Sequence, residues 1–393
     1  MKRKASPFLI SLLMLLLLPF FLHAEEVIDH DFGYSLDIPE GYKVVGYTPD
    51  GTSYQFQHTK LPVTLVLKLY TNGIYTKSKT ALKETLTKLS GQYDNMDSFY
   101  WNSKICAITT FKSSVTNKSG SKGWAIAVPL EETDSMLVLL CYADEKAAQN
   151  CEQFMISTLN SLETGKGTNR SPGIITTYAY PGAEKKQIAF DIAEKTVRTT
   201  IDSEDSEAAQ FVIDCEFAVL SLYANDEHWK EAWTRYYKAI FRDSYSRLDN
   251  AAKDIRSTLE PLVKKQRGRN SEEVLNELLL AWVQNMEYKR ETKDRKSDFT
   301  NVTDILCGKG NDCDSRSLLM CCLMEHYGVK SELFISRVYS HSVYGVDFNL
   351  QGAKINVNGT DFLLNETTAK NIRPGLIAQD QSKTENWIPV DLP

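Results

Sequence analysis

The spacing of hydrophobic residues changes partway along the chain, and this change constrains the fold more than any other feature. Residues 27 to about 163 contain short runs rich in β-branched and aromatic side chains, such as "SYQFQHT", "VTLVLKLYT" and "SMLVLLCYA". From Ser206 to about Met286, apolar residues recur at helical spacing instead. In a strand every second side chain points to the same face, whereas in a helix residues three or four apart share a face. The chain therefore has to hold a β-rich unit followed by a helical one. The fold class we expect is α+β.

The first unit, residues 25–163, is predicted to be an antiparallel sheet with flanking helices. Helical patterns interrupt the strands at Ser78 to Ser90 and at Asp144 to Leu162, where Asp144 is a candidate N-cap. Residues 164–187 are dense in Gly, Pro, Ser and Thr, which is typical of a linker.

The second unit, residues 188–393, begins with a predicted hairpin, "QIAFDIAEKTVRTTID", and continues as a helical segment. The last helix of this segment is predicted to run from Ser271 to Met286. The final hundred residues return to strand-like runs, "SELFIS", "HSVYGVDF", "KINV" and "DFLLN". An Asn358-Gly359 pair between the last two predicts a hairpin turn.

Residues 1–24 have the pattern of a secretory signal peptide. Basic residues 2–4 precede an apolar run from Phe8 to Leu22, and cleavage after Ala24 fits the pattern. The alternative is an uncleaved anchor helix, although the run is shorter than a comfortable membrane span. We expect an exported chain, periplasmic or secreted, with no stable membrane insertion after the signal is removed.

Removing this signal takes away three positive charges and moves the net charge from −6 to −9. An acidic surface repels the phosphates of nucleic acids and of anionic membranes. We therefore expect no nucleic-acid partner.

Eight cysteines in an exported chain raise the question of disulfides. Cys141 and Cys151 could form one, or they could be two buried thiols. Cys215 lies on an apolar helical stripe, which predicts core packing. No Cys-x-x-Cys pair occurs, which disfavours structural zinc.

The segment "KGNDCDSRSLLMCCLMEHYG" carries the residues that point to chemistry. Asn311 or Asp312 is a natural N-cap, so we predict a helix from Cys313 to about Tyr327, with Gly328 at its end. The positive end of a helix stabilises a thiolate and is expected to lower the cysteine pKa. Cys313 is thus placed as a nucleophile would be.

The neighbouring thiols have other predicted roles. Cys321 and Cys322 lie mid-helix and are expected to pack in the core. Cys307 is expected to lie in a loop, and a disulfide with Cys313 is the alternative. His326 would lie roughly 20 Å from Cys313 along the helix, too far to act as its base. A helix would also spread these thiols and His326 too widely for one metal ion. We predict no metal site and no cofactor.

His341 is the better candidate base, because it opens the strand "HSVYGVDF". A strand returning beside the helix can bring its first residue over the helix N-terminus. If the strand "DFLLN" lies beside that strand, Glu366 can accept the imidazole N–H. Asp361 and Asn365 are the alternatives for this third position.

This ordered set resembles the transglutaminase-like superfamily, a circularly permuted relative of the papain-like cysteine proteases. The matching segments are Gly308 to Ser317, Ser340-His341-Ser342 and Phe362 to Ala369. The resemblance implies a papain-like α+β domain with its core at about residues 270–393. It implies Cys313 as nucleophile, His341 as base and Glu366 as third member, where the usual residue is Asp.

The first unit resembles the exported α+β domains related to the photosystem II protein PsbP and to Mog1. The resemblance rests on strand order and on "LDIPEGY", the Leu-x-Ile-Pro-x-Gly-Tyr opening at residues 36–42. Such domains usually bind or scaffold, and the residues of this unit suggest no catalytic cluster.

These observations lead us to expect an exported cysteine hydrolase or acyltransferase, of peptidase or amidase type, acting on amide bonds. The expected partner is a peptide or protein substrate, with peptidoglycan stem peptides as one candidate. The alternative is an inactive envelope binding or assembly protein that keeps the same fold.

Overall fold

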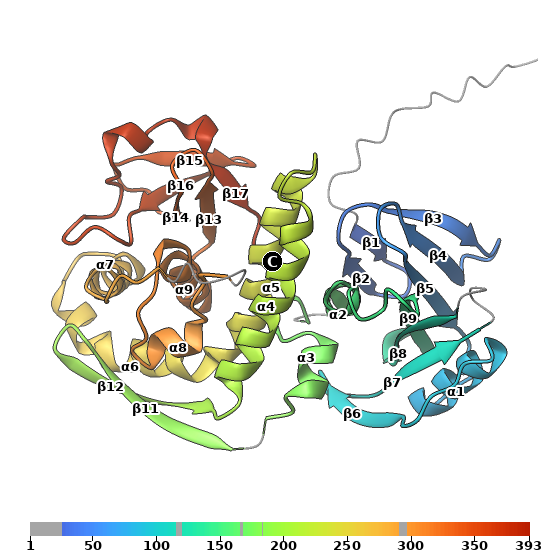
Figure 1. The fold of residues 1–393 in the computed structure, drawn as a ribbon. Coiled ribbons are helices and arrows are strands. Elements are labelled where there is room, and N and C mark those ends of the chain that lie inside the picture. The colour runs from blue at the N-terminus through green and yellow to red at the C-terminus, as the bar shows by residue number, and fades with distance from the viewer. Residues whose placement is uncertain (1–25, 115–119, 166–167, 183, 291–296) are drawn as a thin grey trace, which may run out of the picture.

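The computed structural model describes residues 26–114, 120–165, 168–182, 184–290 and 297–393 (Figure 1). The fold is α+β, with N-terminal antiparallel sheets, a central helical segment and a C-terminal antiparallel sheet with helices. The signal predicted at residues 1–24 lies outside the described residues. None of the described helices is long and apolar enough to cross a membrane.

A seven-stranded antiparallel sheet dominates the N-terminal half. In spatial order its strands are β3 (Tyr42–Tyr47), β4 (Ser53–His58), β5 (Val63–Tyr70), β9 (Ser135–Asp144), β8 (Ser121–Leu130), β7 (Lys104–Ser113) and β6 (Asp97–Trp101). Strand β9 alternates between two cores: Leu137 and Leu139 face helix α2 (Glu152–Asn160), whereas Val138 and Leu140 face helix α1 (Ser78–Lys88). The sheet is therefore covered on both faces.

The predicted helix from Asp144 to Leu162 is wrong in its extent. Asp144 pairs with Ser121 as the last residue of β9, so the sheet ladder holds it extended and it cannot cap a helix. Leu162 starts β10 (Leu162–Thr164), which joins β1 (Glu26–Asp29) and β2 (Tyr34–Asp37) in a three-stranded sheet. Cys141 and Cys151 are both buried free thiols.

Residues 164–187, expected to be a linker, contain a short packed helix, whereas the described residues 181–187 are exposed. A short helix, α3 (Ile174–Ala179), buries Ile174 and Ile175 in the core shared with α2. The side chain of Asn160 fixes its start by accepting hydrogen bonds from the backbone N–H groups of Ile175 and Thr176. Burial of the two isoleucines and the hydrogen bonds to Asn160 thus stabilise a helix within a Gly- and Pro-rich segment.

Of the central helices, the first two lie between the N-terminal and C-terminal sheets, and the others lie under the C-terminal sheet (Figure 1). The central helices are α4 (Asp205–Leu222), α5 (Trp229–Arg247), α6 (Asp249–Lys265), α7 (Ser271–Gln284) and α8 (Val302–Leu306), and the predicted hairpin precedes them as β11 (Lys185–Ile192) and β12 (Lys195–Asp202). Cys215 on α4 is buried in the N-terminal core, which confirms its predicted packing role. Ile213, on the same helix, belongs to the C-terminal core. Helix α4 therefore contributes to both cores.

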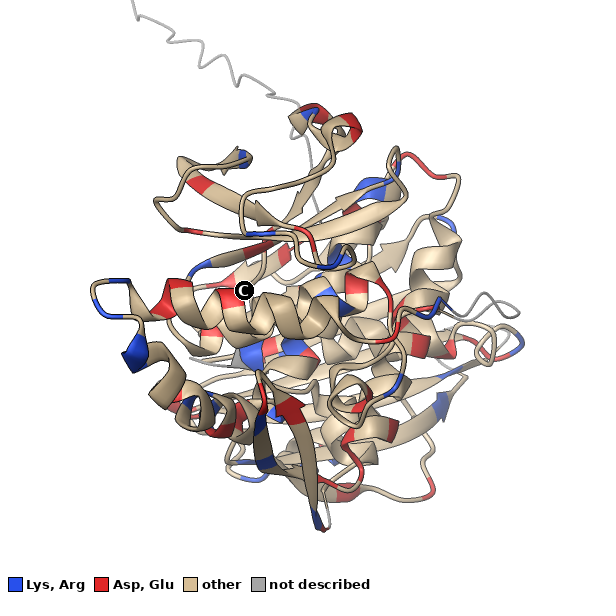
Figure 2. Cartoon of the chain, turned by 90° about the vertical axis from the view of Figure 1, so that its left-hand side faces the viewer, with Lys and Arg blue, Asp and Glu red and all other residues tan. Residues whose placement is uncertain are grey.

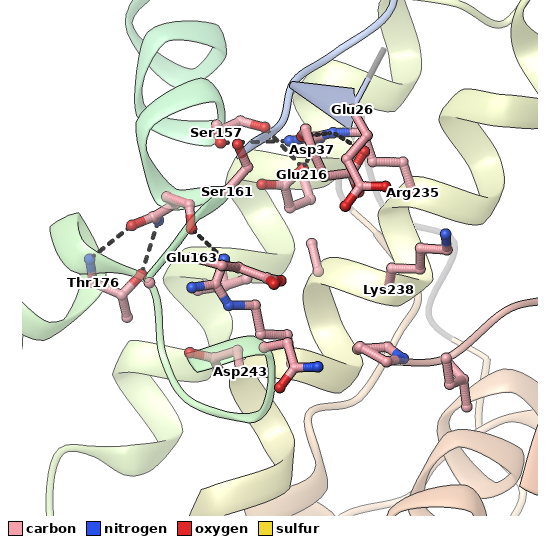
Figure 3. Close-up of a pocket in the computed structure, with 18 of the residues that line it drawn as sticks. Glu26, Asp37, Ser157, Ser161, Glu163, Thr176, Glu216, Arg235, Lys238 and Asp243 are labelled. Atoms are coloured by element: carbon pink, nitrogen blue, oxygen red, sulfur yellow. Dashed lines mark hydrogen bonds and ion pairs between the residues drawn. The ribbon is translucent and has the colours of Figure 1, made fainter. Parts of the chain in front are cut away.

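Arg235 on α5 forms a buried ion pair with α4, and both partners also bond to the N-terminal half. Its Nη1 donates to Glu216 Oε2 at 2.7 Å, and its Nε donates to the Asp37 carbonyl at 2.8 Å. Ser157 on α2 donates to the same Glu216 oxygen at 3.0 Å. Figure 3 shows these side chains converging beside a cavity of about 280 Å³.

The C-terminal sheet has five antiparallel strands over helix α9 (Cys313–His326). Their order is β15 (Lys354–Val357), β16 (Thr360–Asn365), β14 (His341–Val346), β13 (Ser331–Ser336) and β17 (Ile388–Val390). The predicted hairpin is confirmed: Asn358 and Gly359 both have positive φ, 50° and 87°, between β15 and β16. Leu333 and Tyr344 on the sheet face Leu318 and Leu319 of α9 in the C-terminal core.

Acidic and basic residues are interspersed on the face that carries α7 and the C-terminal sheet (Figure 2). Positively and negatively charged residues therefore lie close to one another on this face.

Candidate active site

Helix α9 begins at Cys313, as the sequence predicted. Asp312 is the N-cap, with extended backbone, and its Oδ1 accepts from the Ser315 N–H at 3.3 Å and from the Ser315 hydroxyl at 2.5 Å. The backbone N–H groups of Cys313 and Asp314 donate to no residue in the described part of the chain. Cys313 therefore lies where two free N–H groups and the positive helix end meet.

His341 and Glu366 form a hydrogen-bonded pair. His341 opens β14, and Glu366 directly follows β16, the strand paired with β14. The distance between His341 Nε2 and Glu366 Oε2 is 2.8 Å. The other carboxylate oxygen accepts from the N–H and the hydroxyl of Thr368 at 2.7 and 2.6 Å, so the carboxylate is fixed in orientation.

The two alternative residues for this position are engaged elsewhere. Asp361 accepts a hydrogen bond from Asn356 within the β15–β16 hairpin. The Asn365 amide donates to the Leu363 carbonyl and accepts from Asn276. Of the three candidates, Glu366 is the one that contacts His341.

The Glu366 carboxylate should make folding stability depend on pH in acid. Burial alone would raise its pKa, but the hydrogen bonds from His341 and Thr368 outweigh burial and lower the pKa from 4.5 to about 2. Between these values the unfolded chain binds more protons at this group, so the contribution is present above pH 4.5 and is lost as pH falls toward 2. We expect the difference in unfolding free energy between wild type and Glu366→Gln to shrink over this window, as followed by urea titrations at several pH values. A difference that stays constant with pH would contradict this assignment.

The nearest hydrogen-bond partner of the Cys313 thiol is Asp314, not His341. The thiol donates to Asp314 Oδ1 at a sulfur–oxygen distance of 3.2 Å. No hydrogen bond joins Cys313 to His341 among the described residues. Ser342, which follows His341 on β14, lies beside the Cys313 sulfur and interacts with it. The structure thus brings β14 to the start of α9, with His341 and Glu366 paired and the thiol turned toward a carboxylate.

The predicted lowering of the Cys313 pKa is wrong. Burial raises the pKa of this thiol, and the negative charges of Asp314 and Asp312 raise it further, with Ser342 opposing them only in part. The side chain is only 3% exposed. Burial, reinforced by the aspartates next to the sulfur, raises the pKa of Cys313 despite the helix terminus, so the side chain is a thiol.

Arg316 holds this site together, although sequence reasoning missed it. It is fully buried on α9, and its Nε donates to Asn311 Oδ1 at 2.5 Å. Its Nη atoms donate to the carbonyls of Thr367 and Met286 at 3.1 and 2.9 Å. Because Thr367 directly follows Glu366, Arg316 links the start of α9 to the acid. An arginine among apolar residues of a buried helix was the available signal.

The other thiols and His326 lie away from this pair. Cys321 and Cys322 are buried in the C-terminal core, as predicted. Cys307 is an exposed free thiol and is not bonded to Cys313. The His326 ring stacks on Tyr245 at 4.0 Å and its Nε2 lies 3.0 Å from the Tyr245 carbonyl oxygen, near the far end of α9.

Comparisons with known proteins give a distant likeness of fold. No protein-family model matches the sequence, and no curated protein matches it. About 37% of the chain is structurally similar to cyanobacterial PsbP from Synechocystis, covering 96% of that chain at 9% identity with a TM-score of 0.30. The Ran-binding protein Mog1p of Saccharomyces cerevisiae is similar over 36% of this chain and 94% of its own, at 13% identity with a TM-score of 0.27.

A protein from Bacteroides thetaiotaomicron is similar over 56% of this chain and 78% of its own, at 9% identity with a TM-score of 0.21. None of these comparisons supports the transglutaminase-like resemblance, which stays a prediction.

Proposed function

We propose that the chain is an exported cysteine hydrolase or acyltransferase whose C-terminal unit, about residues 270–393, is transglutaminase-like. The observation that carries this proposal is the His341–Glu366 pair, 2.8 Å between Nε2 and Oε2, with His341 on a strand packed against the helix that starts at Cys313. A nucleophile at a helix N-terminus beside an oriented imidazole is the arrangement that thiol acyl transfer needs. The signal-like residues 1–24 support export.

In the proposed reaction, His341 accepts the proton of the Cys313 thiol as the sulfur attacks an amide carbonyl. Glu366 stabilises the imidazolium that forms. The free N–H groups of Cys313 and Asp314 donate to the oxyanion of the tetrahedral intermediate. The imidazolium then gives its proton to the leaving amine, which leaves a thioester on Cys313. Water, deprotonated by His341, attacks the thioester and releases the acid and the thiol.

The raised pKa of Cys313 favours this general-base route over a preformed thiolate. A thiol that becomes nucleophilic only when His341 takes its proton depends on the imidazole at every turnover. The missing hydrogen bond between the two side chains is compatible with this role, because such bonds often tighten only when substrate binds. Hydrolysis is favoured over cross-linking because water is the abundant acceptor, and peptides are the proposed substrate class.

Replacement of His341 tests this role against a matched control. We expect His341→Asn to lower kcat/KM for hydrolysis of a peptide library by about a hundredfold or more, since positioned general bases contribute at least that much. His326→Asn, on the same helix as Cys313 but near its other end, should retain wild-type turnover. Equal activity of the two variants would refute the assignment.

A second candidate is a binding or assembly protein of the cell envelope. Two observations favour it: Cys313 is buried, and its thiol bonds to Asp314 instead of His341. Under this alternative, the wild-type chain binds peptides without cleaving them, and His341→Asn changes only the stability of the chain.

A further inference from the structure

The N-terminal unit lies beside α4 and α5 (Figure 1), and we call this contact the junction. Glu40, in the turn between β2 and β3, is buried there with 3% of its surface exposed. Its backbone carbonyl accepts hydrogen bonds from the hydroxyl of Tyr223, the residue that ends α4, at 2.7 Å, and from Nε2 of His58 on β4, at 2.9 Å. Donors from both sides of the junction therefore fix the backbone of Glu40.

The carboxylate of Glu40 lacks the partners that its backbone has. In the described part of the chain no other residue supplies a hydrogen-bond partner to either oxygen, and the group that interacts with them is the residue's own N–H. The hydrogen bonds of Arg235 go to Asp37, Glu216 and Ser157 instead. A buried carboxylate without partners is costly, because nothing replaces the water that it loses.

The charges around Glu40 add to this cost. Asp37 on β2 and Glu231 on α5 both raise the pKa of Glu40, and Arg235 on α5 opposes them, although it is already paired with Glu216. Burial is the largest cause, and together these groups raise the pKa of Glu40 from 4.5 to about 7. Oε2 of Glu231 is itself a buried oxygen without a hydrogen-bond partner. The junction therefore favours the neutral form of Glu40.

A proton is the group that relieves this arrangement. A neutral carboxyl is much cheaper to bury than a carboxylate, and its O–H is a hydrogen-bond donor in a place that lacks donors. Loss of that proton puts a negative charge beside Asp37 and Glu231 inside the junction. Water reaches and solvates the new charge only when the turn that carries Glu40 separates from α4 and α5.

We propose that Glu40 is a pH-sensitive switch of the junction. With the carboxyl neutral, the N-terminal unit is held against α4 and α5, and ionisation of the carboxyl opens this contact. The switch does not depend on the proposed hydrolysis, so the absence of peptide cleavage would leave it untouched.

The free energy of unfolding should follow this proton. Between pH 4.5 and 7 the folded chain binds more protons at Glu40 than the unfolded chain, because its pKa is higher in the folded state. The stabilisation is therefore complete below pH 4.5 and is lost as pH rises through 7. From pH 5 to pH 8 we expect the folding equilibrium constant of wild type to fall about tenfold to a hundredfold relative to Glu40→Gln, which stays neutral. Urea titrations of the full mature chain at each pH measure this ratio.

Two buried thiols tell whether the junction opens or the whole chain unfolds. Cys215 on α4 packs against α2, with its sulfur 3.1 Å from the Gln153 carbonyl oxygen, whereas Cys106 lies inside the sheet on β7. Both are labelled with dithiodipyridine and located by peptide mapping. At pH 8 we expect Cys215 of wild type to react at least about tenfold faster than Cys106. This excess should be lost in Glu40→Gln and at pH 5.

Two further variants keep the test independent of Glu40→Gln. Glu231→Gln removes a negative charge that faces Glu40, so the loss of stability should move to lower pH. Glu227→Gln changes a glutamate whose side chain is 83% exposed, between α4 and α5, and should behave as wild type. Wild type and Glu40→Gln with the same dependence of stability on pH, or Cys215 and Cys106 of wild type labelled at one rate at pH 8, would overturn the proposal. So would an equal shift in Glu231→Gln and Glu227→Gln.

Discussion

Cys313→Ser is expected to abolish peptide hydrolysis, with kcat falling by about 10⁴-fold to 10⁶-fold. Serine keeps the position and nearly the volume of the side chain, but its hydroxyl is far less acidic than a thiol and gives up its proton poorly to an imidazole. Loss of the nucleophile of a catalytic triad costs up to about 10⁶ in kcat elsewhere. The measurement is single-turnover hydrolysis of the peptide on which the wild-type chain is most active.

Cys307→Ser is the matched control for this loss. Cys307 precedes α9 by six residues but is exposed and lies outside the site. We expect this variant to hydrolyse peptides at the wild-type rate and to unfold at the same urea concentration. Retained hydrolysis in Cys313→Ser would exclude Cys313 as the nucleophile.

Arg235→Met is expected to destabilise the chain by about 3–5 kcal/mol. Both Arg235 and Glu216 are buried, and the pair joins α4 to α5 while bonding to Asp37 and Ser157 of the N-terminal unit. Without the guanidinium, Glu216 stays in the interior with an unpaired charge, which is costly. The Asp37 carbonyl also loses its hydrogen bond from Arg235. Equilibrium urea unfolding measures the loss.

Two controls separate burial of charge from loss of a contact. In the double variant Arg235→Met with Glu216→Leu, no charge is left unpaired, so most of the stability should return. Arg269→Met breaks the half-exposed pair with Glu277 on the surface and should cost less than about 1 kcal/mol. Equal losses for Arg235→Met and Arg269→Met would contradict the structural role of the buried pair.

The sequence predicted the elements whose signals are local. The β9 strand alternates between two apolar faces, and the Asn358-Gly359 turn forces a two-residue hairpin through positive φ angles. After that hairpin β16 pairs with β14, with Asn365 at its end opposite Tyr344, and Glu366 just beyond the strand reaches His341. The His341–Glu366 pair follows from this register, which is why it was predictable from the residues alone.

The features that sequence reasoning missed depend on distant residues. Asp144 looked like a helix cap, but pairing with Ser121 on another strand extended it. The Gly- and Pro-rich segment was predicted to be a linker, but Asn160 accepts hydrogen bonds from the first turn of a helix within it. Neither Ser121 nor Asn160 lies in the segment whose conformation it determines.

The pKa of Cys313 was misjudged because a single local effect was considered. Cys313 does lie at the N-terminus of α9, and this part of the prediction holds. The adjacent Asp314 could be read in the sequence, but its orientation depends on Tyr237 of α5, which holds one of its oxygens. The aspartates next to Cys313 therefore became visible as its partners only in three dimensions.

Trapping of a covalent intermediate tests the proposed nucleophile and base most directly. The chain is mixed with para-nitrophenyl acetate, quenched in acid, and analysed by intact mass and peptide mapping. We predict one acetyl group on Cys313, formed more slowly in His341→Asn and absent in Cys313→Ser. Acetylation of Cys307 with none on Cys313, or labelling of Cys313 at the same rate in wild type and His341→Asn, would contradict the Cys313–His341–Glu366 assignment.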